Sequence, residues 1–279
     1  MARTVAIIGA GQIGYAAAFA FADRGWDVTI HSRTKPVWFD QAPYKFKTYI
    51  AGETTPSVAD VVVDTIAFDA DDVTRYDPDR IGRLIAISSA SVYRDDAGRT
   101  LDEAAQNGFP EFDGPITEEQ PTVSPGPETY STRKVRMEDR TQELFGDRAT
   151  ILRPCAIFGE HSRHPREWWF VKRMLDKRSR IPLMFEGQSR FQPTDADDIG
   201  CFAVNVAEQE LGGTYNVVTE DCPSVFEIGV TLAYEFECDP EFVLLDQSGI
   251  VGRTPWSVAK PFEVSGQKMI DTGYDLPST

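Results

Sequence analysis

The chain has 279 residues, of which 41% are apolar, and its 44 acidic against 28 basic residues give a formal net charge of −16. This excess of negative charge repels a phosphate backbone, so we expect no nucleic-acid partner. No apolar run approaches the roughly 20 residues of a membrane helix, and the amino-terminal segment lacks a signal-peptide pattern. Composition therefore predicts a cytoplasmic protein with no membrane partner.

Cysteine and histidine, the residues that bind metals most often, are few and poorly spaced for that purpose. The four cysteines, at 155, 201, 222 and 238, form no CxxC pair and no zinc-ligand pattern. We expect them to be buried thiols. His161 and His164 are close in sequence but lie in a loop-like segment, so no metal site is predicted.

The first part of the chain alternates between apolar runs and helical segments. Residues 4–8 read as a buried strand, followed by a glycine turn and a helix to residue 25. Further strands are predicted within 26–33, 58–68, 82–93 and 149–159, and a helix is predicted over 127–145. Such alternation predicts an α/β fold, a Rossmann-type doubly wound parallel sheet.

Two regions depart from this rhythm. Residues 94–127 are acidic, rich in Gly and Pro, and read as a long loop over the site. After residue 160, a helical pattern at 167–178 is followed by short strand patterns at 180–187 and 213–218. We therefore predict a Rossmann domain over 1–160 and, over 161–279, a small C-terminal α+β substrate lobe from which some segments return to the first domain.

The glycine turn has the GxGxxG spacing of a dinucleotide-binding loop. It follows a strand and opens a helix, which is the context that makes the motif credible. Glycines at these positions let the backbone approach a pyrophosphate at the helix amino terminus. The residues predicted to contact the cofactor here are Gly9, Gly11, Gln12, Ile13 and Gly14.

The end of the second predicted strand bears on the choice between NAD and NADP. An acidic residue there would accept hydrogen bonds from the ribose 2′-hydroxyl, but no carboxylate occurs between Asp27 and Asp40. Ser32 and Arg33 stand in that place, and Lys35 follows. Since basic side chains could hold a 2′-phosphate, we predict a preference for NADP(H), with NAD(H) as the alternative.

Tyr130 and Lys134 are four residues apart on a predicted helix, so their side chains share one face. Ser88, Ser89 and Ser91 follow a predicted strand, and ligands of open α/β sheets bind beyond the carboxyl ends of strands. The hydroxyl groups and the Tyr–Lys pair are therefore expected to meet at one site.

These motifs resemble those of the short-chain dehydrogenase/reductase superfamily, in its extended, NAD-dependent epimerase/dehydratase branch. The likeness covers GxGxxG at 9–14, "SSASVY" at 88–93, YxxxK at 130–134 and "LRPCAIFG" at 152–159. The resemblance implies that Ser89 bonds the substrate oxygen, that Tyr130 is the general acid/base, and that Lys134 binds the nicotinamide ribose. A neighbouring ammonium would also favour the phenolate of Tyr130.

The resemblance implies an enzyme that moves hydride between NADP(H) and a secondary alcohol or ketone, sugars included. Dehydratases of the branch carry an Asp-Glu pair where this chain has Ala90 and Ser91, so dehydration is disfavoured. Two alternatives stay open: a nucleotide-sugar epimerase with tightly bound NAD, and a non-catalytic Rossmann protein that binds cofactor as a sensor or scaffold. A monomer or a homodimer is expected.

Substrate contacts are assigned more loosely, to polar and aromatic residues near the motifs. We expect the segment 101–112 to close over the substrate as a lid. The candidate substrate contacts are Ser91, Phe109, Phe112, Arg153, Trp168 and Phe191.

Overall fold

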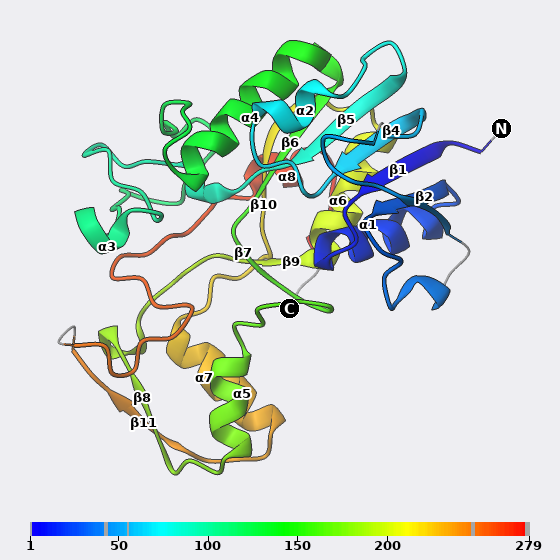
Figure 1. The fold of residues 1–279 in the computed structure, drawn as a ribbon. Helices are drawn as coiled ribbons and strands as arrows, with labels where there is room; N and C mark the ends of the chain where they lie inside the picture. The colour runs from blue at the N-terminus through cyan, green and yellow to red at the C-terminus, as the bar shows by residue number, and fades with distance from the viewer. Residues whose placement is uncertain (1, 42–43, 55, 247–248, 277–279) are drawn as a thin grey trace.

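The structure, a computed structural model, describes residues 2–41, 44–54, 56–246 and 249–276. The main sheet consists of the strands β1 (Thr4–Ile8), β2 (Asp27–Ser32), β3 (Lys45–Thr48), β4 (Ala59–Asp64), β5 (Ile81–Ile87), β6 (Ala149–Pro154) and β10 (Gly213–Val217). Their spatial order is β10–β6–β5–β4–β1–β2–β3, and every neighbouring pair is parallel (Figure 1).

Helices cover both faces of this sheet, as an apolar parallel sheet requires. The helices on one face are α1 (Gln12–Asp23), α6 (Ala196–Glu208) and α8 (Gln267–Ile270), and those on the other are α2 (Ala70–Thr74) and α4 (Tyr130–Phe145). Phe21 and Phe202 fill the first core, and Met137 and Phe145 the second. The predicted Rossmann-type sheet is therefore confirmed.

A smaller body of helices and strands lies beside the sheet, in the lower part of Figure 1. It contains α5 (Trp168–Leu175), α7 (Val225–Glu235) and the parallel pair β8 (Arg180–Leu183) and β11 (Glu241–Leu244). Phe170, Met174, Ile181 and Leu183 form its own buried core. A two-stranded parallel pair, β7 (Ala156–Phe158) and β9 (Pro193–Asp195), runs between the two bodies.

Several elements differ from the sequence-based expectations. The short strand predicted at 213–218 lies in the main sheet and not in the small lobe, because β10 pairs with β6 at the sheet edge; it is one of the segments after residue 160 that return to the first domain. β3 was not foreseen, because its four residues are largely exposed and carry two lysines. Cys201 is exposed, so the prediction of four buried thiols was wrong, although all four cysteines are free.

The loop at 94–127 is built into the fold through backbone contacts at several points. Tyr93 pairs with Thr122, and Ile116 pairs with Val264 near the carboxyl terminus. The helix α3 (Ala104–Asn107) lies within the loop. The remaining short elements are the 3₁₀ turns η1 (Phe39–Gln41), η2 (Ala90–Val92), η3 (Gly146–Arg148) and η4 (Phe185–Gly187).

Candidate active site

The glycine turn after β1 is shaped so that side chains are excluded at two of its three glycines. Gly9 has φ +103°, and a Cβ there would lie 2.2 Å from Thr65 Oγ1. A Cβ on Gly14 would lie 2.2 Å from the carbonyl oxygen of Gly9, so only glycine lets α1 approach the turn this closely. A Cβ on Gly11 would meet nothing within 4 Å, which leaves its backbone open to a ligand.

The amino terminus of α1 adds the electrostatics of an anion site. Gly11 is its N-cap and supplies no side-chain hydrogen bond, so the first backbone N–H groups lack a side-chain acceptor. Gly11, Gln12 and Ile13 all line the cavity described below. The residues present therefore fit a bound pyrophosphate, as the GxGxxG spacing predicts.

The loop after β2 holds the residues predicted to select the cofactor. Ser32 Oγ donates a hydrogen bond to the carbonyl of Thr34 and so stays within its own turn. Lys35 Nζ pairs with Asp40 Oδ1 at 2.9 Å, which partly neutralises it. Arg33 is exposed and forms no ion pair with any residue that the structure describes. Arg33 is thus the cation of this loop that remains available to a ligand.

Ser89 and Tyr130 meet beyond the carboxyl end of β5. Ser89 caps the turn η2 by accepting a hydrogen bond from the backbone N–H of Ser91 at 3.1 Å. Tyr130 opens α4 and is 40% exposed. Desolvation raises the pKa of Tyr130; a side-chain hydrogen bond with Ser89 lowers it, and the charge of Asp102 raises it further. The net effect is a raised pKa for Tyr130, so the phenol is held in its protonated form.

Lys134 lies one helical turn after Tyr130, with its ammonium directed into the protein. It is 6% exposed, and Nζ donates to the carbonyls of Ala67 at 2.7 Å and Ile87 at 2.9 Å. Nζ is 5.7 Å from the centroid of the Tyr130 ring. Burial lowers the pKa of Lys134 to about 8, against the opposing effect of Asp64. The causes of the shift at Tyr130 are burial, Ser89 and Asp102, so a lowering of its pKa by Lys134 stays a prediction.

Arg153 belongs to a buried polar network and does not reach the cavity. Its guanidinium pairs with Glu138, with Nε at 3.0 Å from Oε1 and Nη2 at 2.5 Å from Oε2. Ser88 donates a hydrogen bond to the same carboxylate, and Arg153 faces the ring of Tyr93 at 4.9 Å. The prediction of Arg153 as a substrate contact is therefore not supported. Glu138 was missed, although its position four residues after Lys134 places it on the same helical face.

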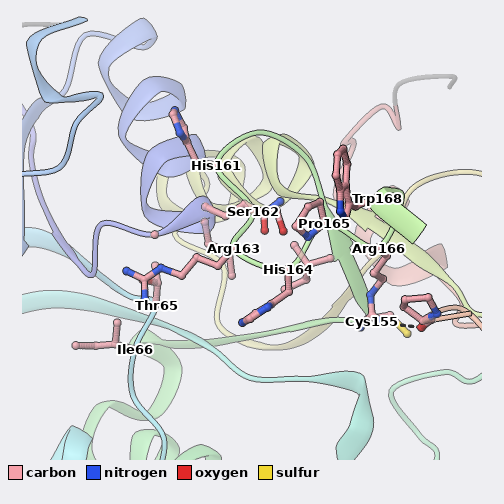
Figure 2. Close-up of a pocket in the computed structure, with 15 residues that line it drawn as sticks. Thr65, Ile66, Cys155, His161, Ser162, Arg163, His164, Pro165, Arg166 and Trp168 are labelled. Carbon is pink, nitrogen blue, oxygen red and sulfur yellow. Dashed lines mark hydrogen bonds between the residues drawn. The ribbon is translucent and has the colours of Figure 1, made fainter. Parts of the chain in front are cut away.

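A cavity of about 740 Å³ opens beside the glycine turn (Figure 2). Trp168, which is half exposed, is one of its lining residues, and its contact with substrate stays a prediction. The segment 161–166, which follows β7, supplies much of its wall and was not predicted as a site. The lining residues are Gly11, Gln12, Ile13, Thr65, Ile66, Cys155, Ile157, His161, Ser162, Arg163, His164, Pro165, Arg166, Trp168 and Pro255.

The other aromatic candidates serve packing. Phe109 contacts Phe185 with ring centroids 6.2 Å apart, and Phe112 contacts Phe262 at 5.6 Å. Phe191 also packs edge-on against Phe262, at 5.8 Å. None of the three predicted rings is among the residues that line the cavity. The proposal of Phe109 or Phe112 as a substrate contact is thus unsupported in this arrangement, and closure of 101–112 stays a prediction.

The described residues hold no group of three or more His, Cys, Asp or Glu side chains arranged to bind a metal ion. Nor does any helix within the described ranges have the length and apolar character needed to cross a membrane.

Comparison with known proteins bears on the fold. No protein-family model matches the chain, and no curated protein matches it either. Solved structures do match over nearly the whole chain. The dTDP-glucose 4,6-dehydratase of Bacillus anthracis, in complex with NAD, has a TM-score of 0.71 at 15% identity, and the match covers 100% of this chain and 93% of that one.

Two epimerases match equally well. A UDP-N-acetylglucosamine 4-epimerase of Methanobrevibacter ruminantium has a TM-score of 0.73 at 15% identity, with 99% of this chain and 93% of that chain covered. The UDP-glucuronic acid 4-epimerase of Bacillus cereus, solved with UDP-glucuronic acid and NAD, has a TM-score of 0.69 at 15% identity, with coverages of 99% and 95%. The resemblance expected from the motifs is confirmed for the fold: the chain folds like extended short-chain dehydrogenases/reductases.

Proposed function

We propose that the protein is an NAD(P)-dependent oxidoreductase of the extended short-chain type, which moves hydride between cofactor and a secondary alcohol or ketone. The observation that carries this proposal is the meeting of Ser89 and Tyr130 beyond β5, with Lys134 one turn further along α4. The glycine turn of the same sheet fits a dinucleotide pyrophosphate. When bound, the nicotinamide supplies the hydride donor or acceptor.

The proton chemistry belongs to Tyr130. In the direction of reduction, its phenol gives a proton to the carbonyl oxygen as that oxygen gains charge, and the raised pKa keeps this proton in place until then. The hydroxyl of Ser89 can donate a second hydrogen bond to the same oxygen. Lys134 donates to the carbonyl groups of Ala67, in the segment after β4, and of Ile87, at the end of β5. The resemblance to the short-chain family assigns the cofactor ribose to the same ammonium.

NADP(H) is the proposed preferred cofactor, and Arg33 is the residue that supports this choice. Arg33 is exposed at the end of β2 without an acidic partner in the described ranges, and a guanidinium binds a 2′-phosphate through charge-assisted hydrogen bonds. Lys35 contributes less, because Asp40 already pairs with it. Two of the structural neighbours reported above were solved with NAD, which makes NAD the alternative cofactor.

The test is a titration followed by a substrate screen. Fluorescence titration should give a lower Kd for NADPH than for NADH, and Arg33→Gln should weaken NADPH binding while leaving NADH binding unchanged. Equal affinities for both nucleotides in the wild type would remove the NADP preference. A screen of sugars and ketones with both cofactors should then yield turnover. Nucleotide binding without turnover on any compound would favour the sensor or scaffold alternative.

A nucleotide-sugar epimerase is the second candidate, because epimerases are among the proteins with the same fold over more than nine tenths of their length. An epimerase oxidises and reduces the same carbon, so it retains its NAD through the cycle. The absorbance spectrum of the purified protein and the nucleotide released on denaturation distinguish an epimerase from an oxidoreductase. Stoichiometric NAD after purification favours the epimerase; an empty site favours the oxidoreductase.

A further inference from the structure

The cavity beside the glycine turn has a charge opposite to that of the chain. The protein carries a net charge of −16, yet the residues that line the cavity include no Asp or Glu. Instead, the six residues 161–166 contribute two imidazoles and two guanidiniums, from His161, His164, Arg163 and Arg166. An apolar wall with basic side chains and no acids favours anionic ligands.

The two arginines lie at different ends of this cavity. In Figure 2, Arg163 extends toward Thr65, on the side of the glycine turn where a pyrophosphate fits. Arg166 lies on the opposite side, beside Cys155 at the end of β6 and close to the small lobe. A cofactor bound along the glycine turn would engage the first end. The basic group at the second end is therefore left for another ligand.

Arg166 is held firmly, but not by a carboxylate. Its Nη1 donates to the carbonyl of Pro255 at 2.6 Å, and its guanidinium faces the rings of Phe191 at 5.3 Å and Trp256 at 5.5 Å. No ion pair within the described ranges involves Arg166, and Glu167 influences it only through space. Burial lowers the pKa of Arg166, which reflects the cost of desolvating this cation.

A partly buried guanidinium without an acidic partner is an expensive arrangement unless a ligand supplies the charge. Arginine has five N–H donors in a planar fork, and the contact with Pro255 uses one nitrogen. The remaining donors match two oxygens of a carboxylate or a phosphate. The aromatic rings that flank Arg166 fix the plane of the fork, so the ligand is bound with a defined orientation.

We propose that Arg166 binds an anionic group, a carboxylate or a phosphate, at one end of the substrate. This inference rests on the proposed function for the position of the cofactor, and it specifies the class of substrate for the same site. Neutral ketones and neutral sugars would then be poor substrates. Preferred substrates would carry the anionic group at the end of the molecule opposite to the reacting carbonyl. Trp168, on the same side of the cavity, offers an apolar surface to the rest of the molecule.

Calorimetric titration tests the proposal without a known substrate. Inorganic phosphate and acetate are titrated into protein with and without saturating NADP⁺, and the two probes distinguish a phosphate site from a carboxylate site. We expect one of them to bind in both states, and Arg166→Gln to weaken that binding at least tenfold. Arg166→Lys should retain part of it. The matched control Arg178→Gln, at an exposed position after α5, should bind the probe like the wild type.

The outcomes separate this proposal from the proposed function. If the wild type binds neither probe, or Arg166→Gln binds as the wild type does, the anion site is wrong, whatever the cofactor results show. If neither nucleotide binds, the proposed function fails, while the titration of nucleotide-free protein still decides the role of Arg166. Thermal melting confirms that each variant is folded. Once a substrate is found, Arg166→Gln should raise KM for it far more than it lowers kcat.

Discussion

Asp102, in the loop between β5 and α4, accepts two hydrogen bonds from Ser131, the residue next to Tyr130. Its Oδ2 lies 2.8 Å from the backbone nitrogen and 2.5 Å from the hydroxyl oxygen of Ser131. The same hydroxyl also lies 2.8 Å from the carbonyl oxygen of Ser91. The long loop is thereby attached to the first turn of the helix that carries the proposed acid, and it places a negative charge there.

Replacing that charge should change the titration of Tyr130. Asp102 raises the pKa of Tyr130, so Asp102→Asn, which keeps an oxygen acceptor for the Ser131 N–H, should move this pKa downward. The measurement is the tyrosinate absorbance as a function of pH, with the curve of the matching Tyr130→Phe protein subtracted. Asp113→Asn, at an exposed position of the same loop, is the control. An unchanged or raised pKa in Asp102→Asn would contradict the electrostatic role.

Tyr130→Phe should separate proton transfer from binding. Removal of a general acid/base lowers turnover by about 10²–10⁴-fold. Affinity for the nicotinamide nucleotide should stay within about twofold, because the ring and its contact with Phe68 are retained. Steady-state kinetics on a substrate from the screen, together with nucleotide titration, measure both effects. Near-normal turnover of this variant would exclude Tyr130 from the mechanism.

Lys134→Met should destabilise the fold as well as reduce activity. The variant leaves the carbonyls of Ala67 and Ile87 without their donor, and a buried unsatisfied acceptor costs about 1–3 kcal/mol. Urea denaturation should show this loss in the free energy of unfolding. Lys172→Met removes a lysine from an exposed ion pair and should change stability by less than about 1 kcal/mol. If both substitutions lower the free energy of unfolding by the same amount, the hydrogen bonds of Lys134 to Ala67 and Ile87 do not stabilise the fold.

His31 should make the protein acid-sensitive. It is 1% exposed, neither ring nitrogen has a hydrogen-bond partner, and burial, aided by Lys47, lowers its pKa to about 4. An unfolded histidine titrates near 6.5, so the unfolded state binds more protons between these values. Stability is therefore fully present above about pH 6.5 and falls as the pH drops toward 4, by at most about 3 kcal/mol.

His31→Phe tests this assignment, because phenylalanine cannot take up a proton. The free energy of unfolding is measured from pH 7 to pH 4.5 for the wild type and the variant. As the pH falls, the wild type should lose stability relative to the variant. His164→Phe, at an exposed position, is the comparison. A constant difference across this range would show that His31 is not the group that titrates.

The parts of the site that sequence analysis could predict are those encoded by neighbouring residues. Gly9 and Gly14 are recognisable because the turn and the helix that need them are continuous in sequence. Tyr130 and Lys134 share a helical face for the same reason, and the strong apolar runs of β1, β4 and β5 identify the buried strands. These local patterns, taken in order, were enough to predict a doubly wound sheet.

What sequence analysis missed depends on contacts between distant segments. Arg153 near the end of a buried strand reads as a ligand contact, but its partner Glu138 arrives from α4 through packing. The segment 161–166 reads as an ordinary loop, and its place over the cavity follows from the course of the chain between β7 and α5. The apolar residues of β10 indicate a strand without indicating the sheet it joins.

One edge of the main sheet has a consequence for how the protein behaves at high concentration. β3 is the last strand in the described sheet, and an unpaired edge can recruit a strand from another molecule. The chain has only eight lysines, yet Lys45 and Lys47 both stand in this four-residue strand, where they are exposed. Lys45 pairs with Asp27, whereas Lys47 contacts only the hydroxyl group of Ser57 and forms no ion pair within the described residues. The ammonium of Lys47 therefore repels the same group on an identical edge from a second molecule. We therefore expect Lys47 to disfavour edge-to-edge association through β3, one of the two edge strands of the described sheet.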